Sequence, residues 1–277
     1  MDEPKIGLAL SGGGYRATLF CLGSLWRFND AGLLRQLDTI TSVSGGAIAA
    51  GYLALRWDDL DFEEIGNKSV ATNFQAVIAK PLIRFTQNKI DIPSAIKGMI
   101  LPTSSVGDQL LKQYESLLFG DTRLDSILNE RAPQFVFYAT NYDTGVSVRI
   151  SKECLRDWRI GKVVNHGLTV AQAVCISSSF PPFFAPIVVK NEDWIWENTK
   201  YSDLHDIEHL KRKLFLCDGG LYDNLGLEML WKTGSDREYD TVFSCDAGAP
   251  FSAPVKQSDG LWGKFLKGIG WRKNWGS

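Results

Sequence analysis

This chain of 277 residues is poor in the side chains that most often bind metals, with three histidines and five cysteines. No two cysteines form a Cys-x-x-Cys pair, and most of them lie in apolar runs, where buried reduced thiols are common. His205 and His209 are four residues apart, but their surroundings lack the His-Glu-x-x-His pattern of a zinc site. We therefore expect a reducing compartment and no metal site.

The sequence also lacks a strong charge of either sign and a long apolar run. A net charge of −2 argues against nucleic-acid binding, which needs a basic surface. Residues 6–10 are too short an apolar run for a signal peptide. Two uncharged stretches, 39–55 and 163–189, contain too many polar residues or prolines to span a bilayer. We expect a cytoplasmic protein with at most peripheral membrane contact.

The chain does contain enough apolar residues to fold, with 44% hydrophobic and 22% charged residues. A buried strand over 5–10, a helix over 15–31, a strand over 38–43 and a helix over 47–57 succeed one another. This alternation predicts an α/β fold with a parallel sheet and helices on its faces. We predict further strands at 134–140, 146–150, 213–217 and 241–245, and further helices at 106–118, 169–176 and 225–231.

No interdomain linker or internal repeat is evident, so we expect one domain over residues 1–277. Two stretches interrupt its regular pattern and are interpreted as insertions, about 58–133 and 191–213.

The turn after the second predicted strand has the pattern of a nucleophile elbow. Residues 39–46 read Thr-Ile-Thr-Ser-Val-Ser-Gly-Gly, which places Ser44 between a strand and a helix. Gly45 and Gly46 remove side chains that would crowd such a turn, and the positive end of the following helix lies near the serine hydroxyl. The usual pattern is Gly-x-Ser-x-Gly, and Ser42 replaces its first glycine. The alternative is an ordinary glycine-rich turn.

A second glycine-rich turn comes after the first predicted strand. Gly12, Gly13 and Gly14 can direct backbone N–H groups toward one point, which suits either a phosphate or an oxyanion. The spacing matches neither of the common nucleotide-binding patterns, so we favour an oxyanion hole that Arg16 braces. A plain tight turn is the remaining alternative.

Asp218 comes directly after the strand predicted at 213–217 and precedes two glycines. We expect this strand to be parallel to the first two, because the carboxyl edge of a parallel sheet is where ligands bind. Asp218 is then the candidate general base for the Ser44 hydroxyl. No histidine lies in a motif, and we interpret His166 as structural or exposed. A Ser–Asp dyad is therefore favoured over a triad.

The three motifs occur in a fixed order that resembles the patatin-like phospholipases. Ser11–Arg16 reads Ser-Gly-Gly-Gly-Tyr-Arg, and the elbow at 42–46 and the Asp-Gly-Gly at 218–220 come after it. The elbow is most similar to the branch related to cytosolic phospholipase A. Ser177–Pro186 resembles that family's serine-proline block, and Tyr222–Gly226 resembles the segment next to its Asp-Gly-Gly.

The resemblance covers about residues 5–250 and implies a three-layer sandwich with a mostly parallel central sheet and helices on both faces. It implies that Ser44 is the nucleophile, that Asp218 is the base, and that Gly12, Gly13 and Gly14 form the oxyanion hole. The implied reaction is hydrolysis of a lipid acyl ester through an acyl-enzyme, without metal or cofactor. Two alternatives stay open: a catalytically silent lipid-binding protein of the same fold, and a nucleotide-binding α/β protein.

Two segments suggest contact with lipid. Aromatic and basic residues interleave over 261–275, as they do in helices that lie on anionic membranes, although a last core helix would look similar. The apolar stretch 81–102 is a candidate lid over a lipid site, with a satellite of the core as the alternative.

Overall fold

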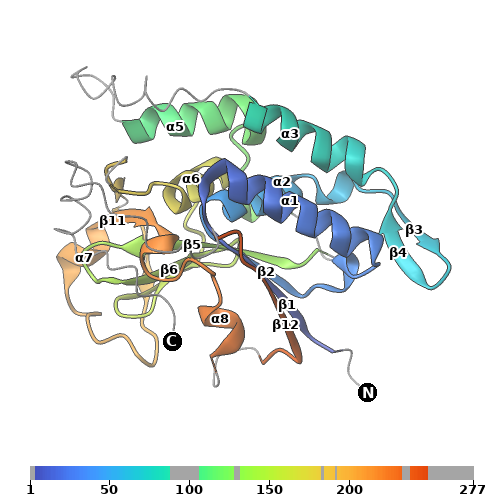
Figure 1. Cartoon of the computed structure of the whole chain (residues 1–277). Helices are drawn as coiled ribbons and strands as arrows, with labels where there is room; N and C mark the ends of the chain where they lie inside the picture. Colours follow the sequence, from blue (N-terminus) through green and yellow to red (C-terminus); the bar gives the residue numbers. More distant parts are fainter. Residues whose placement is uncertain are drawn as a thin grey trace, which may run out of the picture.

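The structure is a computed structural model that describes residues 4–87, 106–127, 132–181, 184–190, 192–232 and 238–248. Its main feature is a ten-stranded mixed sheet with helices packed against it (Figure 1). The α/β class expected from the sequence is confirmed. The candidate membrane segment at 261–275 and most of the candidate lid lie outside the described residues.

The helices and strands have these bounds along the chain. The strands are β1 (Ile6–Leu10), β2 (Thr39–Ser42), β3 (Phe62–Ile65), β4 (Lys68–Ala71), β5 (Gln134–Asn141), β6 (Val146–Ile150), β7 (Leu155–Asp157), β8 (Gly161–Val163), β9 (Ile187–Lys190), β10 (Trp196–Glu197), β11 (Lys213–Asp218) and β12 (Thr241–Cys245). The α-helices are α1 (Gly14–Asp30), α2 (Gly45–Leu55), α3 (Lys80–Gln87), α5 (Val106–Tyr114), α6 (Val170–Ser177), α7 (Glu208–Arg212) and α8 (Glu228–Trp231). Short 3₁₀ or π turns are η1 (Leu34–Gln36), η2 (Trp57–Asp59), η3 (Gln75–Ala79), η5 (Glu115–Phe119), η6 (Leu124–Ser126) and η7 (Gly219–Leu221).

The centre of the sheet is parallel, in the order β12, β1, β2, β5, and its register aligns the strand ends. Leu10 pairs with Ser42, and Ser42 pairs with Phe137. β1 and β2 are built from β-branched and aliphatic runs that are buried on both faces, as expected for a parallel sheet covered by helices. The glycine loop after β1 and the serine turn after β2 therefore emerge side by side.

The strand that carries Asp218 runs in the opposite direction from the one expected. β11 is antiparallel to both β5 and β9, so the prediction of a parallel strand was wrong. β5 extends beyond the end of β2, and β11 returns along this extension until Asp218 lies opposite Ala139. That level is two residues past the Phe137–Ser42 pair, and Ser44 is likewise two residues past Ser42. Asp218 therefore lies at the same edge of the sheet as Ser44, although its strand approaches that edge from the opposite direction.

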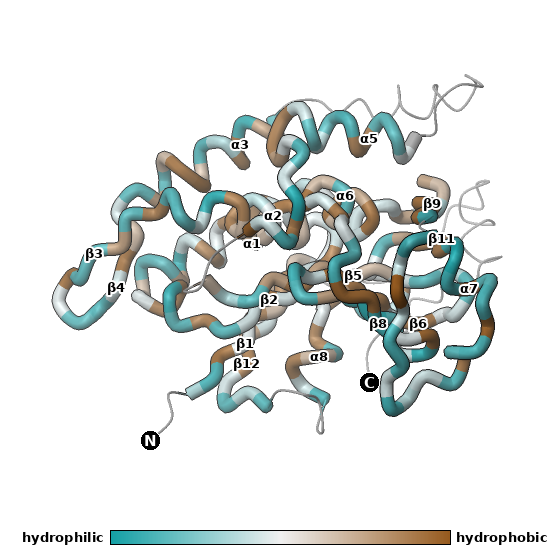
Figure 2. Tube along the Cα trace, turned by 180° about the vertical axis from the view of Figure 1, so that it is seen from behind, coloured by the Kyte–Doolittle hydropathy of each residue, from teal (hydrophilic) through white to brown (hydrophobic). Residues whose placement is uncertain are grey.

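Helices cover the sheet unequally (Figure 1). α1, α2 and α6 pack on one face, α3 and α5 form a second tier over them, and the short α8 lies against the other face. α2 is almost entirely buried, because its Gly/Ala-rich sequence lets it pack between α1, α6 and the sheet. Hydrophobic residues gather along the central strands, and hydrophilic residues along much of α5 and at the tip of the β3–β4 hairpin (Figure 2).

The β3–β4 hairpin, which the sequence did not indicate, is attached to α1 by one buried side chain. Asn29 is 2% exposed, and its Nδ2 donates to the carbonyl oxygen of Ala71 at 3.0 Å. Its Oδ1 accepts from the Ala71 N–H at 2.8 Å. These two hydrogen bonds satisfy both the N–H and the carbonyl of Ala71, which is 2% exposed.

We expect Asn29→Ala to lower the free energy of unfolding by about 2–4 kcal/mol, because it leaves a buried N–H and a buried carbonyl without partners. Urea unfolding of the purified protein measures this. Gln36→Ala is the matched control, because it removes one partly buried hydrogen bond to the Gly32 carbonyl and should cost about 1 kcal/mol or less. Equal losses in the two variants would contradict this role of Asn29.

Candidate active site

Ser44 occupies a strained backbone position at the junction of β2 and α2. Its φ of 50° and ψ of −115° are rare for a residue with a side chain and are typical of functional turns. Ser42, which stands where a glycine is usual, is extended in β2 and donates its hydroxyl to the Val136 carbonyl at 3.2 Å. Because this position needs no positive φ, serine fits without distorting the elbow.

The turn can close only because glycine comes after Ser44. A Cβ on Gly45 would lie 2.1 Å from the carbonyl oxygen of Gly14, and one on Gly46 would lie 2.4 Å from that of Leu10. Thr18 of α1 donates its hydroxyl to the Gly45 carbonyl at 2.9 Å. The first turns of α1 and α2 are therefore in direct backbone contact, and both positive helix ends meet at the same place.

Asp218 lies within hydrogen-bonding reach of Ser44 and is nearly removed from water. Asp218 is 2% exposed and accepts from the Gly220 N–H at 2.7 Å, and it lies close enough to the Ser44 hydroxyl for that group to lower its pKa. Burial raises the pKa of Asp218 to about 6, and the hydrogen bond from Gly220 and the nearby Ser44 hydroxyl act in the opposite direction. The carboxylate is thus a stronger base than an exposed aspartate and is still ionised at neutral pH.

The end of α6 holds both members of this pair, a feature that motif reading missed. The hydroxyl of Ser177, which is fully buried, accepts from the Ser44 N–H at 3.0 Å. Two residues later, the Ser179 carbonyl accepts from the Asp218 N–H at 3.1 Å. The sequence indicated this stretch only as part of the serine-proline block at Ser177–Pro186, without showing which groups its serines would bind.

The glycine loop differs from the expected oxyanion hole at one position. The Gly12 N–H donates to the Asn224 carbonyl at 3.0 Å, so it is not available to a ligand, and the prediction for Gly12 was wrong. Gly13 and Gly14 have φ values of 138° and 66°, and their N–H groups have no acceptor within the described part of the chain. The same holds for the N–H of Gly45, which the sequence motifs did not indicate as a donor.

Arg16 reaches across to the segment after β12. Its Nη2 donates to the Ala247 carbonyl at 3.3 Å, and the Ala247 N–H donates to the Ser11 hydroxyl at 2.8 Å. These contacts attach the glycine loop to that segment.

His166 takes no part in this site. It is 4% exposed, its Nε2 lies 2.7 Å from the Ser151 carbonyl, and its Nδ1 accepts from the Leu168 N–H at 3.1 Å. Burial lowers the pKa of His166.

Among the described residues there is no group of three or more histidine, cysteine or carboxylate side chains that could hold a metal. Within the same ranges, no helix is both long and apolar enough to cross a bilayer.

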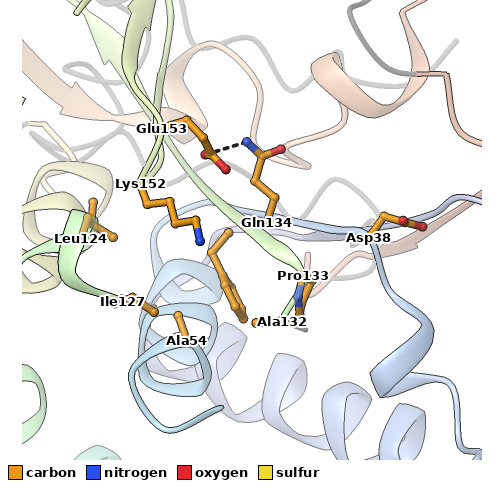
Figure 3. A pocket seen from close by; sticks show the side chains of 10 residues that line it. Asp38, Ala54, Leu124, Ile127, Ala132, Pro133, Gln134, Lys152 and Glu153 are labelled. Carbon is orange, nitrogen blue, oxygen red and sulfur yellow. Dashed lines mark hydrogen bonds between the residues drawn. The ribbon is translucent and has the colours of Figure 1, made fainter. Parts of the chain in front are cut away.

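A cavity of about 240 Å³ lies at the opposite edge of the sheet (Figure 3). Asp38 and Gln134, which stand where β2 and β5 begin, line it together with Lys152 and Glu153. Gln134 donates to Glu153 at 2.7 Å. Since Ser44 lies beyond the other end of β2, this cavity is separate from the Ser44–Asp218 pair.

Comparison with known proteins identifies the family of this chain. The sequence profile of the patatin-like phospholipase family matches residues 8–231, which include Ser44 and Asp218. The chain belongs to the patatin-like phospholipase family. Over 46 residues, 17% of the chain, it is 50% identical to the Saccharomyces cerevisiae protein named "Putative meiotic phospholipase SPO1", of which it covers 7%.

Two of the solved structures that resemble this one illustrate the similarity. Human GIVD cytosolic phospholipase A2 superposes with a TM-score of 0.50 at 15% identity, over 84% of this chain and 41% of that chain. VipD from Legionella pneumophila is similar over 85% of this chain and 48% of its own, at 19% identity and a TM-score of 0.41. This patatin-like chain therefore spans less than half the length of each of these relatives.

We expect Ser177→Ala to destabilise the elbow, because it leaves the Ser44 N–H without its acceptor. The free energy of unfolding should fall by about 1–3 kcal/mol, and Ser44 should react more slowly with a fluorophosphonate, as measured by intact-protein mass. Ser116→Ala, which removes an exposed bond to the Gln113 carbonyl, is the control and should change neither. Normal stability and labelling in Ser177→Ala would contradict this role.

Proposed function

We propose that this chain is a serine lipid acyl hydrolase that cleaves carboxylic ester bonds of phospholipids or related lipids. The observation that carries the proposal is that the Ser44 hydroxyl lies close to Asp218, a buried aspartate whose pKa is raised to about 6. A carboxylate with this pKa is ionised at neutral pH and accepts a proton better than an exposed one, which is what a general base requires. Membership in the patatin-like phospholipase family supports lipid esters as the substrate class.

In the first step, Asp218 takes the proton of the Ser44 hydroxyl as Oγ attacks the ester carbonyl carbon. The carbonyl π electrons move onto oxygen, and the resulting tetrahedral intermediate carries one negative charge. When the intermediate collapses, the carbon–oxygen bond to the alcohol breaks and the alcohol oxygen takes the proton from Asp218. The fatty acyl group then remains as an ester on Ser44.

In the second step, a water molecule replaces the alcohol. Asp218 accepts a proton from this water as its oxygen attacks the acyl carbon, and a second oxyanion forms at the same position. Collapse releases the fatty acid, and the proton held by Asp218 returns to Ser44 Oγ. The aspartate is thus base and acid in turn, and the cycle needs no histidine.

The negative charge forms where the two helices begin. The N–H groups of Gly13, Gly14 and Gly45 supply the donors of the proposed oxyanion hole, with Gly45 in place of Gly12. Because α1 and α2 begin here, the positive ends of both helices add to the stabilisation. The strained backbone of Ser44 holds the hydroxyl out of the sheet before substrate arrives, so this arrangement needs little reorganisation during the reaction.

We expect Ser44→Ala and Asp218→Asn each to lower kcat on a phospholipid or a chromogenic ester by at least about a thousandfold, without lowering the melting temperature. The fluorophosphonate should add once to the wild-type protein, at Ser44, and not to Ser44→Ala. Intact-protein mass and peptide mapping measure the adduct. Wild-type protein that binds lipid vesicles but neither turns over esters nor forms the adduct would instead be a silent lipid-binding protein.

The pH dependence of the reaction is set by the raised pKa of Asp218. Only the ionised carboxylate can accept the serine proton, so kcat/KM should rise about tenfold per pH unit below the inflection and level off above it. The inflection is expected near pH 6, where Asp218 ionises. His166→Asn is the control, and its inflection should not move. An inflection that disappears in His166→Asn would assign the base to histidine and contradict the dyad.

A further inference from the structure

The segment after β11 brings the side chain of Asn224 to the reacting groups. Gly12 donates its N–H to the Asn224 carbonyl at 3.0 Å, which attaches this segment to the glycine loop. Asp223 fixes the turn itself, because its carboxylate accepts from the N–H groups of Leu225 and Gly226 at 3.1 and 3.0 Å. The backbone position of Asn224 is therefore held without the help of its own side chain.

Distances at two glycines place the Asn224 amide next to both the nucleophile and the base. A Cβ on Gly12 would lie 2.5 Å from Asn224 Oδ1 and 3.1 Å from Ser44 Cβ. A Cβ on Gly220 would lie 2.7 Å from the same Oδ1 and 3.0 Å from Asp218 Oδ1. Because each of these points is close to two atoms, the amide oxygen is at most about 6 Å from Ser44 Cβ and from Asp218 Oδ1.

The Asn224 side chain has no role in the fold that the described residues reveal. Asn224 is exposed, in contrast to the buried Asp218, and its amide has no hydrogen-bond partner in the described part of the chain. Its φ is not positive, so the turn does not need asparagine for a left-handed conformation. An accessible amide beside the reacting groups is therefore available to a molecule that takes part in the reaction.

The spacing of the two oxygens suits a single water molecule. Hydrogen bonds between oxygens extend to about 3.0 Å, so one water can join two oxygens up to about 6 Å apart. The water that attacks an acyl-enzyme carries two protons, and Asp218 accepts only one of them. The amide oxygen of Asn224 can accept a hydrogen bond from the other. A departing alkoxide carries no proton and has nothing to donate to this oxygen.

We propose that the Asn224 amide oxygen holds the hydrolytic water against Asp218 during deacylation, and so favours water over alcohols as the acceptor of the acyl group. This rests on the proposed function of the Ser44–Asp218 pair. The water donates one hydrogen bond to each oxygen, which leaves a lone pair for the acyl carbon. Only the O–H bond directed at Asp218 breaks as the new carbon–oxygen bond forms. The other proton stays on the water oxygen and becomes the hydroxyl proton of the released fatty acid.

Asn224→Ala tests this on p-nitrophenyl butyrate, whose activated leaving group makes acylation fast and deacylation the slow step. We expect kcat to fall about tenfold, the effect of losing one hydrogen bond of about 1.4 kcal/mol. The value of kcat/KM should stay within about twofold, because it reports the steps up to acylation. Stopped-flow absorbance should show a burst of about one p-nitrophenol per protein as the acyl-enzyme accumulates.

Methanol as a competing nucleophile separates the attack of water from every earlier step. Methanol has a single hydroxyl proton, which Asp218 accepts, so its attack does not use Asn224. At a fixed methanol concentration, the ratio of methyl butyrate to butyrate should therefore rise about tenfold in Asn224→Ala. Gas chromatography of the products measures this ratio.

Two further variants control for structural effects. Asn224→Leu removes the amide at similar volume, and it should match Asn224→Ala in both kinetics and product ratio. Asn198→Ala changes an exposed asparagine just after β10, at the end of the sheet away from β1, and should change neither. The melting temperatures of all three variants should stay near that of the wild type, because no hydrogen bond among the described residues is lost.

Equal losses of kcat and kcat/KM with an unchanged product ratio would assign Asn224 to acylation and overturn the proposal. Wild-type kinetics and product ratio in both Asn224 variants would overturn it as well. Either result leaves the hydrolase itself intact. A wild-type protein that does not turn over esters would instead refute the proposed function.

Discussion

The site depends on the contact between the backbones of α1 and α2. Gly14 and Gly45 approach so closely that no side chain fits between them. This contact brings two helix N-termini to one point, and each supplies N–H groups that the helices cannot satisfy themselves. A larger residue at Gly45 would separate the helices and, with them, the proposed oxyanion donors from the serine. The same close contact therefore determines both how the two helices pack and where their N–H groups lie in the site.

The second requirement is that a distant part of the chain brings Asp218 to this point. The parallel centre of the sheet positions the glycine loop and Ser44, but Asp218 arrives on a strand of opposite direction. The overhang of β5 past β2 makes this possible, because it offers β11 a partner beyond the parallel core. The end of α6 then fixes the spacing through two hydrogen bonds, one to each residue of the pair.

The sequence predicts best what short-range patterns control. β1, α1, β2 and α2 lie within a few residues of their expected ranges, because glycine turns and apolar periodicity mark their ends. The direction of β11 was not predictable, since it is set by pairing with β5 and β9 rather than by its own residues. The Gly12–Asn224 bond likewise joins two segments that are far apart in the sequence. Motif order indicates the serine–aspartate pair, but only the three-dimensional structure shows which N–H groups of the described residues are free.

The burial of Asp218 also affects the stability of the whole protein. Because its pKa is raised to about 6 on folding, from an ordinary value of 3.8, the folded state holds its proton more tightly than the unfolded chain does. Stability from this group is therefore greatest below about pH 4 and falls as the pH rises toward about 6. At neutral pH the ionised carboxylate costs the fold on the order of 3 kcal/mol. Asp218 therefore stabilises the folded state least at the pH at which its carboxylate is ionised and able to accept a proton. The rest of the core must compensate for that loss.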